Sequence, residues 1–311
     1  MNYLITGGTG LVGSTLVESL LKDGHLVRVL TRRPEKARQT LPEGAIPVEW
    51  DAKTLSGWTN ALEDTDTVVH LAGEPTSGDS IISIVFDRWT KEKKDRILSS
   101  RVKMGNLLAE AIRAAENKPR VFLHASAVGY YSPSGTQALT EDSPPGTDYS
   151  AQVCKQDEAS TQEMESLGVR RVITRGGLVF TQKGGILGVM LLPFKLFVGG
   201  PLGDGTQPVP WVHIEDEINA FRFLIENPEA HGPFNLAAPD RIDYNDFAWI
   251  ASKVLRRPSW FRVPAFLLRL GLGEKAELVL QGQQVVPQRL RELGFKFKYT
   301  QLENALQDLT S

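Results

Sequence analysis

The chain has 311 residues, 41% of them hydrophobic and 23% charged, which excludes a disordered or fibrous protein. Its 35 basic and 37 acidic residues give a net charge of −2, so no basic excess favours nucleic acid or an anionic membrane as a partner. The single cysteine, Cys154, excludes an internal disulfide and any multi-cysteine zinc or iron–sulfur site.

No targeting segment is visible in the sequence. Met1 leads directly into a short apolar run and then into glycines, without the basic start and apolar stretch of a secretory signal. The longest apolar stretch, residues 186–194, is well short of a bilayer span. We therefore expect a cytoplasmic protein that does not act in a membrane.

The first 125 residues alternate short β-rich runs with helical patterns. We expect strands at 4–5, 26–30, 46–50, 67–72 and 120–125, and helices at about 11–21 and 91–115. A helix at about 151–167, a sixth strand at 169–174 and short helices from about 240 follow, the last near 302–309. This alternation predicts an α/β fold, a doubly wound parallel sheet with helices on both faces.

The length suggests two units. We expect a first unit over residues 1–175, to which segments at about 205–240 return. Residues 176–311 would supply a smaller second unit and a C-terminal helical region.

A glycine-rich turn joins the first predicted strand to the first helix. Its glycines at 7, 10 and 13 are spaced G-x-x-G-x-x-G, and such a turn lets backbone N–H groups approach a pyrophosphate at a helix N-terminus. The alternative is a tight turn without a ligand. We expect cofactor contacts from Gly7, Thr9, Gly10, Leu11, Val12 and Gly13.

The end of the second strand indicates which cofactor is bound. An NAD site places an acid there, whereas this strand ends in Arg32 and Arg33, with no carboxylate before Glu35. Guanidinium groups match the oxygens of a 2′-phosphate in pairs, so the sequence predicts NADP rather than NAD. The alternative is a solvated basic loop.

At this point the sequence resembles the extended short-chain dehydrogenase/reductase superfamily. More narrowly, it is similar to the "epimerase family" of NADP-dependent sugar-nucleotide epimerase-like oxidoreductases that carry an added C-terminal helical segment. The resemblance runs from residue 2 to about 308, and it implies a Rossmann core that binds the dinucleotide over residues 1–175 and a smaller substrate domain within 176–311. It is carried by the segments TGGTGLVG (6–13), HLAGEP (70–75), RWT (88–90), SSRV (99–102), SAVGYY (126–131), ILGVMLLPF (186–194), GGPLGDGTQ (199–207), WVHIEDE (211–217), GPFNLAAP (232–239) and GQQVVPQRL (282–290).

The resemblance implies further cofactor contacts at the strand ends. Leu71, Ala72 and Gly73 correspond to the small residues beside the cofactor after the fourth strand. Asp51 lies where related folds hydrogen-bond the adenine, with a cap or turn role as the alternative. Arg175 follows the sixth strand, where extended members place backbone that faces nicotinamide and substrate.

The expected catalytic constellation is incomplete. In the superfamily a Ser after the fifth strand orients substrate, a Tyr transfers the proton, and a Lys four residues later lowers the pKa of that Tyr and binds the nicotinamide ribose. Ser126 and Lys155 match two of these positions, but Ala151 stands where the Tyr should be. Tyr149 has the wrong spacing to replace it.

Two other phenols are candidates for the missing proton donor. Tyr130 and Tyr131 follow Ser126 in the turn that the resemblance places beside the nicotinamide. A phenol has a pKa of about 10 and needs a nearby cation to act near neutrality. We expect Tyr131 to supply the hydroxyl, held by Ser126 and assisted by Lys155, with Tyr130 as the second candidate. The alternative is that both tyrosines shape the pocket.

For several other residues, a structural role competes with a contact to a ligand or metal. His213 has no second histidine at metal-ligand spacing, so we expect no metal site, and a structural role for His213. Asn235 is expected to steady a loop rather than to touch substrate. Arg88 and Trp89 are either ligand contacts or a capping and packing pair.

Two classes of function remain open. The first is an NADP-dependent oxidoreductase or epimerase acting on a small polar or nucleotide-linked substrate. The second is a protein that senses NADPH without turning anything over, and Ala151 is the feature that favours it. We expect a small molecule as the partner, and whether the chain forms a homodimer stays open.

Overall fold

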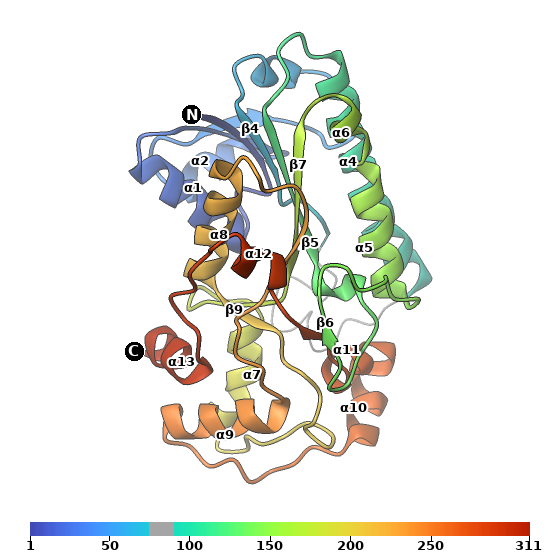
Figure 1. The fold of residues 1–311 in the computed structure, drawn as a ribbon. Coiled ribbons are helices and arrows are strands. Elements are labelled where there is room, and N and C mark those ends of the chain that lie inside the picture. Colours follow the sequence, from blue (N-terminus) through green and yellow to red (C-terminus); the bar gives the residue numbers. More distant parts are fainter. Residues whose placement is uncertain (75–89) are drawn as a thin grey trace.

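The computed structural model describes residues 1–74 and 90–311, so Arg88 and Trp89 lie outside the described residues. Its centre is a sheet of seven parallel strands in the order β10-β7-β5-β4-β1-β2-β3 (Figure 1). The strands span Asn2–Thr6 (β1), Leu26–Thr31 (β2), Ile46–Glu49 (β3), Thr67–His70 (β4), Val121–Ala127 (β5), Arg170–Gly176 (β7) and Gly232–Leu236 (β10). The predicted doubly wound α/β fold is confirmed.

Helices cover both faces of the sheet. One face carries α1 (Leu11–Lys22) and α8 (Ile214–Glu226), and the other carries α4 (Lys91–Ala114), α5 (Tyr149–Ser160) and α6 (Glu163–Ser166) (Figure 1). Alternate residues of a strand point to opposite faces, so Tyr3 and Ile5 pack with α1 while Leu4 packs with α4. This double burial explains why the strands are nearly continuous hydrophobic runs.

On the α5 side, the side chains near the carboxyl ends of the strands are polar. The sheet contributes buried Thr6, His70, His124 and Arg175, together with Arg171 nearer the start of β7, and α5 and the residue after it contribute buried Asp157, Glu158 and Thr161. We call these eight residues the polar layer. Because buried polar groups are costly unless they are paired, the layer must be organised by its own hydrogen bonds.

A smaller, mainly helical part lies beyond the carboxyl ends of the strands (Figure 1). Its core joins α7 (Ile186–Lys195), α9 (Tyr244–Leu255) and α13 (Leu302–Thr310) through Phe194, Phe247 and Leu306. Two short strand pairs link distant segments: β6 (Ala138–Leu139) pairs with β11 (Gln284–Val285), and β8 (Leu178–Phe180) pairs with β9 (Trp211–His213). The remaining elements are α2 (Pro34–Thr40), η1 (Thr59–Leu62), η2 (Val128–Tyr130), α10 (Ala265–Leu272), η3 (Gly273–Ala276), α11 (Glu277–Leu280) and α12 (Gln288–Glu292).

Two predicted elements end earlier than expected. The strand predicted over 67–72 stops at His70, because Leu71 and Ala72 leave the ladder and pass against the glycine-rich turn. The helix predicted over 151–167 is divided into α5 and α6 at Thr161, whose hydroxyl donates back to the Glu158 carbonyl.

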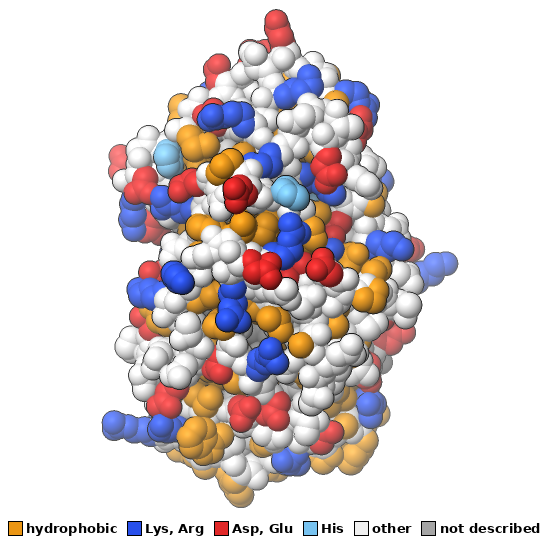
Figure 2. Space-filling model, in the orientation of Figure 1, with side chains coloured by type: hydrophobic (Ala, Val, Ile, Leu, Met, Phe, Trp, Pro, Cys, Tyr) orange, Lys and Arg blue, Asp and Glu red, His pale blue; other side chains and the backbone are white. Residues whose placement is uncertain are grey.

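The surface is evenly mixed in charge. Basic and acidic side chains are interspersed over the face shown in Figure 2, in keeping with the net charge of −2. Among the described residues, none of the helices combines the length and apolarity needed to span a bilayer.

Candidate functional site

The glycine-rich turn after β1 requires glycine at two of its three positions for internal reasons. Gly7 has a φ of +72°, and a Cβ on it would lie 2.8 Å from the Ala72 nitrogen. A Cβ on Gly13 would lie 2.3 Å from the Gly7 carbonyl oxygen. Gly10 differs, because a Cβ there would meet a single atom, the Gly7 oxygen, at 3.2 Å. The outer side of Gly10 is therefore open. We call residues 7–13, with this open side, the cradle.

The N-terminus of α1 lies directly behind this opening. Its N-cap is Gly10, and no side chain caps the helix. The amides of Leu11, Val12 and Gly13 belong to the first turn, where N–H groups have no partner within the helix. Thr9 and Gly10 are exposed. This arrangement of N–H groups and helix dipole suits a phosphate.

Two arginines follow the neighbouring strand at the same edge of the sheet. Arg32 and Arg33 are exposed just beyond β2, which pairs in parallel with β1. Glu35, the nearest acid in the sequence, is ion-paired with Arg38. Within the described part of the chain, neither Arg32 nor Arg33 has an ion-pair partner, so both guanidinium groups remain available to an anionic ligand.

The carboxylate of Asp51 is occupied by its own turn. It accepts hydrogen bonds from the Lys53 and Thr54 amides at 2.8 and 2.9 Å and from the Thr54 hydroxyl at 2.9 Å. The backbone hydrogen bonds lower the pKa of Asp51 below its usual value. The geometry favours the turn alternative over an adenine contact.

The segment after β4 closes the other side of the turn. The Leu71 amide donates to the Thr6 carbonyl at 3.1 Å, and the Ala72 amide donates to the Thr6 hydroxyl at 3.2 Å. A Cβ on Gly73 would lie 2.7 Å from the Arg101 guanidinium carbon. Ala72 and Gly73 are small enough for the segment to pass between Gly7 and Arg101, and the cofactor contacts expected of residues 71–73 stay a prediction.

Ser126, at the end of β5, is held by a buried ion pair. Its hydroxyl donates to Glu158 at 2.8 Å. Glu158 in turn accepts two hydrogen bonds from Arg175, at 3.0 and 2.9 Å. Burial opposes the charge on Arg175, but the hydrogen bonds and charge of Glu158 outweigh it and raise the pKa of the guanidinium. Arg175 therefore contributes its side chain to the polar layer, and the cofactor contact expected at this position stays a prediction.

The two tyrosines of the following turn have different surroundings. Tyr131 is fully buried, and its hydroxyl donates to Asn235 at 2.7 Å and accepts from Arg175 at 2.8 Å. Burial raises the pKa of Tyr131 to about 12, despite the opposing effect of Arg175. Tyr130 is half-buried, with the Arg175 guanidinium 3.4 Å from the centre of its ring. The predicted proton donor, Tyr131, would have to leave both partners to reach a substrate.

Asn235 and His213 have the structural positions expected of them. The side-chain Nδ2 of Asn235 donates to the carbonyls of Leu139 and Val286, and so holds the β6–β11 pair against β10. His213 caps α8 by accepting a hydrogen bond from the backbone N–H of Glu215. Its ring stacks on that of Tyr299, with 3.7 Å between the two ring centres. A surface hollow of about 460 Å³ adjoins His213 but contains none of the predicted cofactor or catalytic residues.

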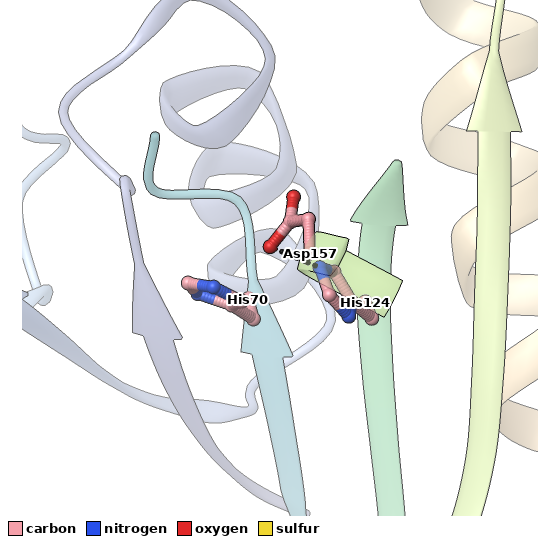
Figure 3. A group of neighbouring side chains, drawn as sticks. All are labelled: His70, His124 and Asp157. Atoms are coloured by element: carbon pink, nitrogen blue, oxygen red, sulfur yellow. Dashed lines mark ion pairs between the residues drawn. The ribbon is translucent and has the colours of Figure 1, made fainter. Parts of the chain in front are cut away.

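A group that the sequence analysis missed lies in the polar layer. His70 and His124 are register partners on adjacent strands, and Asp157 approaches them from α5 (Figure 3). Burial lowers the pKa of His70 to about 3. Burial alone would raise the pKa of Asp157, but His124, His70 and Arg101 outweigh it and lower that pKa to about 2. The available signal was that the fourth and fifth predicted strands each carry a histidine after an apolar run.

The model of the NAD-dependent epimerase/dehydratase family matches residues 3–237. The chain belongs to this family. A second match, to a domain of unknown function termed DUF1731, covers residues 263–309, the C-terminal segment that contains α10 to α13.

Relatives in the family match over nearly the whole chain. The chloroplastic homolog of epimerase family protein SDR39U1 from Arabidopsis thaliana is 39% identical over 98% of this chain and 86% of its own length. Epimerase family protein SH2119 from Staphylococcus haemolyticus is also 39% identical, over 99% and 98%.

Solved structures of epimerase-type proteins are also similar to this chain. Human epimerase family protein SDR39U1, solved with NADPH, has a TM-score of 0.88 at 32% identity, and the match covers 99% of both chains. A nucleoside-diphosphate sugar epimerase from Corynebacterium glutamicum has a TM-score of 0.78 at 29% identity, over 99% of this chain and 58% of that one. The resemblance predicted from the sequence motifs is thereby confirmed.

The departure from the superfamily's catalytic motif is visible in α5. Ala151 is fully buried, and Lys155 is exposed on the outer side of the helix. The buried face instead carries Cys154, Asp157 and Glu158. Burial raises the pKa of the Cys154 thiol to about 12, so it stays protonated and inert. The structure brings Ser126 together with Glu158 and Arg175, and it does not bring Lys155 to them.

Proposed function

We propose that the chain is an NADP(H)-dependent oxidoreductase or epimerase of the short-chain dehydrogenase/reductase type, acting on a small polar or nucleotide-linked substrate. The observation that carries the proposal is the uncapped N-terminus of α1 behind the open side of Gly10, with unpaired Arg32 and Arg33 at the same sheet edge. Such a cradle fits a pyrophosphate, and the arginines fit a 2′-phosphate. The human relative solved with NADPH supports this cofactor.

The bound nicotinamide would donate or accept a hydride at a substrate carbon, and the protein must then handle a proton. We propose that Tyr130, rather than Tyr131, does so. Tyr130 is half-buried, its hydroxyl has no hydrogen-bond partner among the described residues, and its ring lies against the Arg175 guanidinium. Ser126, fixed by Glu158, would orient the substrate oxygen.

A second candidate is an NADPH-binding protein without turnover. The buried Ala151 favours it, because no phenol occupies the superfamily's usual position for proton transfer. The Glu158–Arg175 pair would then only stabilise the fold beneath a cofactor site. Both candidates bind NADPH at the cradle. They differ in whether the chain turns over a substrate at a rate that depends on Tyr130.

Calorimetry with NADPH and NADH tests the cofactor, and mass spectrometry of small molecules that copurify with the chain supplies a substrate to assay. For an enzyme, we expect Tyr130→Phe to lower turnover roughly 10²–10⁴-fold, the usual cost of losing a general acid, with NADPH affinity kept. Tyr131→Phe should instead lower stability by about 1–3 kcal/mol, because it leaves Arg175 and Asn235 without the buried hydroxyl.

The outcomes separate the candidates. Failure to bind either cofactor would overturn both of them. Binding of NADPH with no hydride transfer to any copurified compound would favour the second. A loss of turnover in Tyr131→Phe at unchanged stability would return the proton-transfer role to Tyr131.

A further inference from the structure

We propose that His70, His124 and Asp157 form a binding site for a divalent transition-metal cation of the zinc type. The site goes beyond the proposed function, because neither hydride transfer nor binding to the cradle requires it. The three side chains come from β4, β5 and α5 and meet inside the polar layer (Figure 3). Each offers one ligand atom, and these atoms lie within 4.8 Å of one another.

Both imidazoles are held in place through their second nitrogen. Nδ1 of His70 is 2.7 Å from the Thr6 hydroxyl, and Nδ1 of His124 is 2.9 Å from the Thr161 hydroxyl. Histidine ligands are commonly oriented in this way, with a hydrogen bond at one ring nitrogen and the metal at the other. The threonines therefore supply the outer support that a metal site needs.

Two ligand atoms at the centre of the group face each other. Nε2 of His124 lies 3.2 Å from Oδ1 of Asp157, and the two side chains are 1% and 3% exposed. Among the described residues, the only polar contact of either atom is with the other one. Because both atoms are buried, a proton or a metal cation must lie between them for this contact to be favourable.

A metal ion fits the spacing between Nε2 of His124 and Oδ1 of Asp157. Two ligand atoms at about 2.0–2.1 Å from a tetrahedral cation lie roughly 3.3 Å apart. The observed 3.2 Å between Nε2 and Oδ1 matches this separation. Two nitrogens and one carboxylate oxygen, with a fourth position open, form a donor set that zinc accepts and that magnesium does not favour.

The charges around the group suit a cation on one side of Asp157. Its other oxygen, Oδ2, lies 3.3 Å from the Arg101 guanidinium, which keeps the carboxylate ionised and leaves Oδ1 for the metal. The competing occupant is a proton, in an imidazolium–carboxylate pair between His124 and Asp157. A metal would also brace the cradle, since Thr6 directly precedes Gly7 and Asp157 directly precedes Glu158.

The test uses the full chain without an affinity tag. After chelator treatment and dialysis, Zn²⁺, Co²⁺ or Mg²⁺ is added separately, and bound metal is measured by mass spectrometry. We expect one equivalent of Zn²⁺ or Co²⁺, visible Co²⁺ absorption typical of nitrogen and oxygen ligands, a higher Tm with Zn²⁺, and no such response to Mg²⁺. His124→Gln and Asp157→Asn should weaken binding by more than the roughly 10–100-fold that loss of an outer partner costs.

His213→Gln is the matched control. His213 is also buried, with Nε2 3.3 Å from a carboxylate oxygen of Asp308, but among the described residues no second histidine joins that pair. Its Zn²⁺ affinity should equal that of the unmodified chain. The proposal is overturned if the folded, unmodified chain takes up no Co²⁺, or if His124→Gln and Asp157→Asn bind metal as the control does. Should either variant fail to fold, the Co²⁺ absorption of the unmodified chain decides alone.

Discussion

The glycine-rich turn and the polar layer lie at the same edge of one sheet, yet they are built in opposite ways. The turn is made of backbone: Gly7 and Gly13 are required by close contacts, and α1 presents uncapped N–H groups. The polar layer is made of buried side chains from β1, β4, β5, β7 and the region of α5. The turn therefore keeps the pattern of its family, whereas α5 departs from the superfamily's Tyr–Lys pair, with buried Ala151 and exposed Lys155 at the two positions.

The comparison implies that the layer contributes more to folding than the turn does. The largest effect is expected for Arg175→Met, which leaves Glu158 buried without its cation. Breaking a buried ion pair by removing one partner typically costs about 3–5 kcal/mol. Urea unfolding followed by circular dichroism would measure this loss of free energy of unfolding.

Arg113→Met is the control for that variant. Arg113 makes an ion pair of similar form with Glu163, but the two side chains are 53% and 38% exposed. Exposed pairs are worth about 0–1 kcal/mol. If both variants lower the free energy of unfolding by the same amount, the buried Glu158–Arg175 pair stabilises the fold no more than an exposed pair does. The polar layer would then not contribute more to folding than the turn.

For the turn, the expected loss is in binding rather than in folding. Gly10→Val suits the local backbone, with φ −79° and ψ 177°, and it would place its side chain in the opening. We expect NADPH affinity to fall by about 100-fold or more, equivalent to roughly 3 kcal/mol, with Tm nearly unchanged. Calorimetry measures the affinity.

Gly271→Ala serves as the control, because a Cβ at this position in α10 meets nothing within 4 Å. It should bind NADPH as the unmodified chain does. A Gly10→Val protein that retains full affinity would show that the turn is a tight connection without a ligand, the alternative that the sequence left open.

The next effect contrasts two buried carboxyls on opposite faces of β7. Arg175 faces α5 and meets Glu158, whereas Gly176 leaves room on the other face for Glu217 of α8. Oε2 of Glu217 is buried without a partner, and burial raises the pKa of this carboxyl to about 8. The folded chain therefore holds a proton that the unfolded chain releases above about pH 4.5, so this group makes stability fall as pH rises from about 5 to about 8.

Glu217→Gln should remove that pH dependence. At pH 7 to 8 the variant is expected to be more stable than the unmodified chain by roughly 2–3 kcal/mol, with little difference near pH 5. Denaturant unfolding at a series of pH values measures the slope. Glu215→Gln, which removes a surface pair with Lys298, should leave the slope as it is. An unchanged slope in Glu217→Gln would mean that Glu217 is ionised in the fold.

The same contrast explains what could be predicted from the sequence. The parallel sheet, the glycine turn and the basic end of β2 follow from patterns within about 30 residues, because local backbone geometry demands those residue types. The polar layer depends on contacts across the chain, such as that between Thr6 and His70, 64 residues apart. In α5 the buried face is itself polar, so the pattern gave no sign that Glu158 lies inside and Lys155 outside.

The smallest effect concerns the choice of cofactor. Arg32 and Arg33 lie beyond the end of β2, exposed and without an ion-pair partner among the described residues, whereas Arg38 is tied to Glu35. Replacing both Arg32 and Arg33 with Ala should weaken the binding of NADPH by roughly 1–3 kcal/mol, the scale of lost charge-assisted hydrogen bonds. The affinity for NADH should change little. Because these charges are exposed, the preference for NADPH should also shrink as salt is added.

Arg38→Ala is the control, since it removes a cation from the same basic stretch that is already paired. Calorimetric titration of both cofactors at two salt concentrations separates the outcomes. If NADPH and NADH weaken equally in the double variant, the two arginines attract anions in general, and a side chain other than these would have to read the 2′-phosphate. If only NADPH weakens, the side chains beside the turn set the cofactor choice while its backbone sets the affinity. The contrast between backbone and side chain then holds within the cofactor site as well.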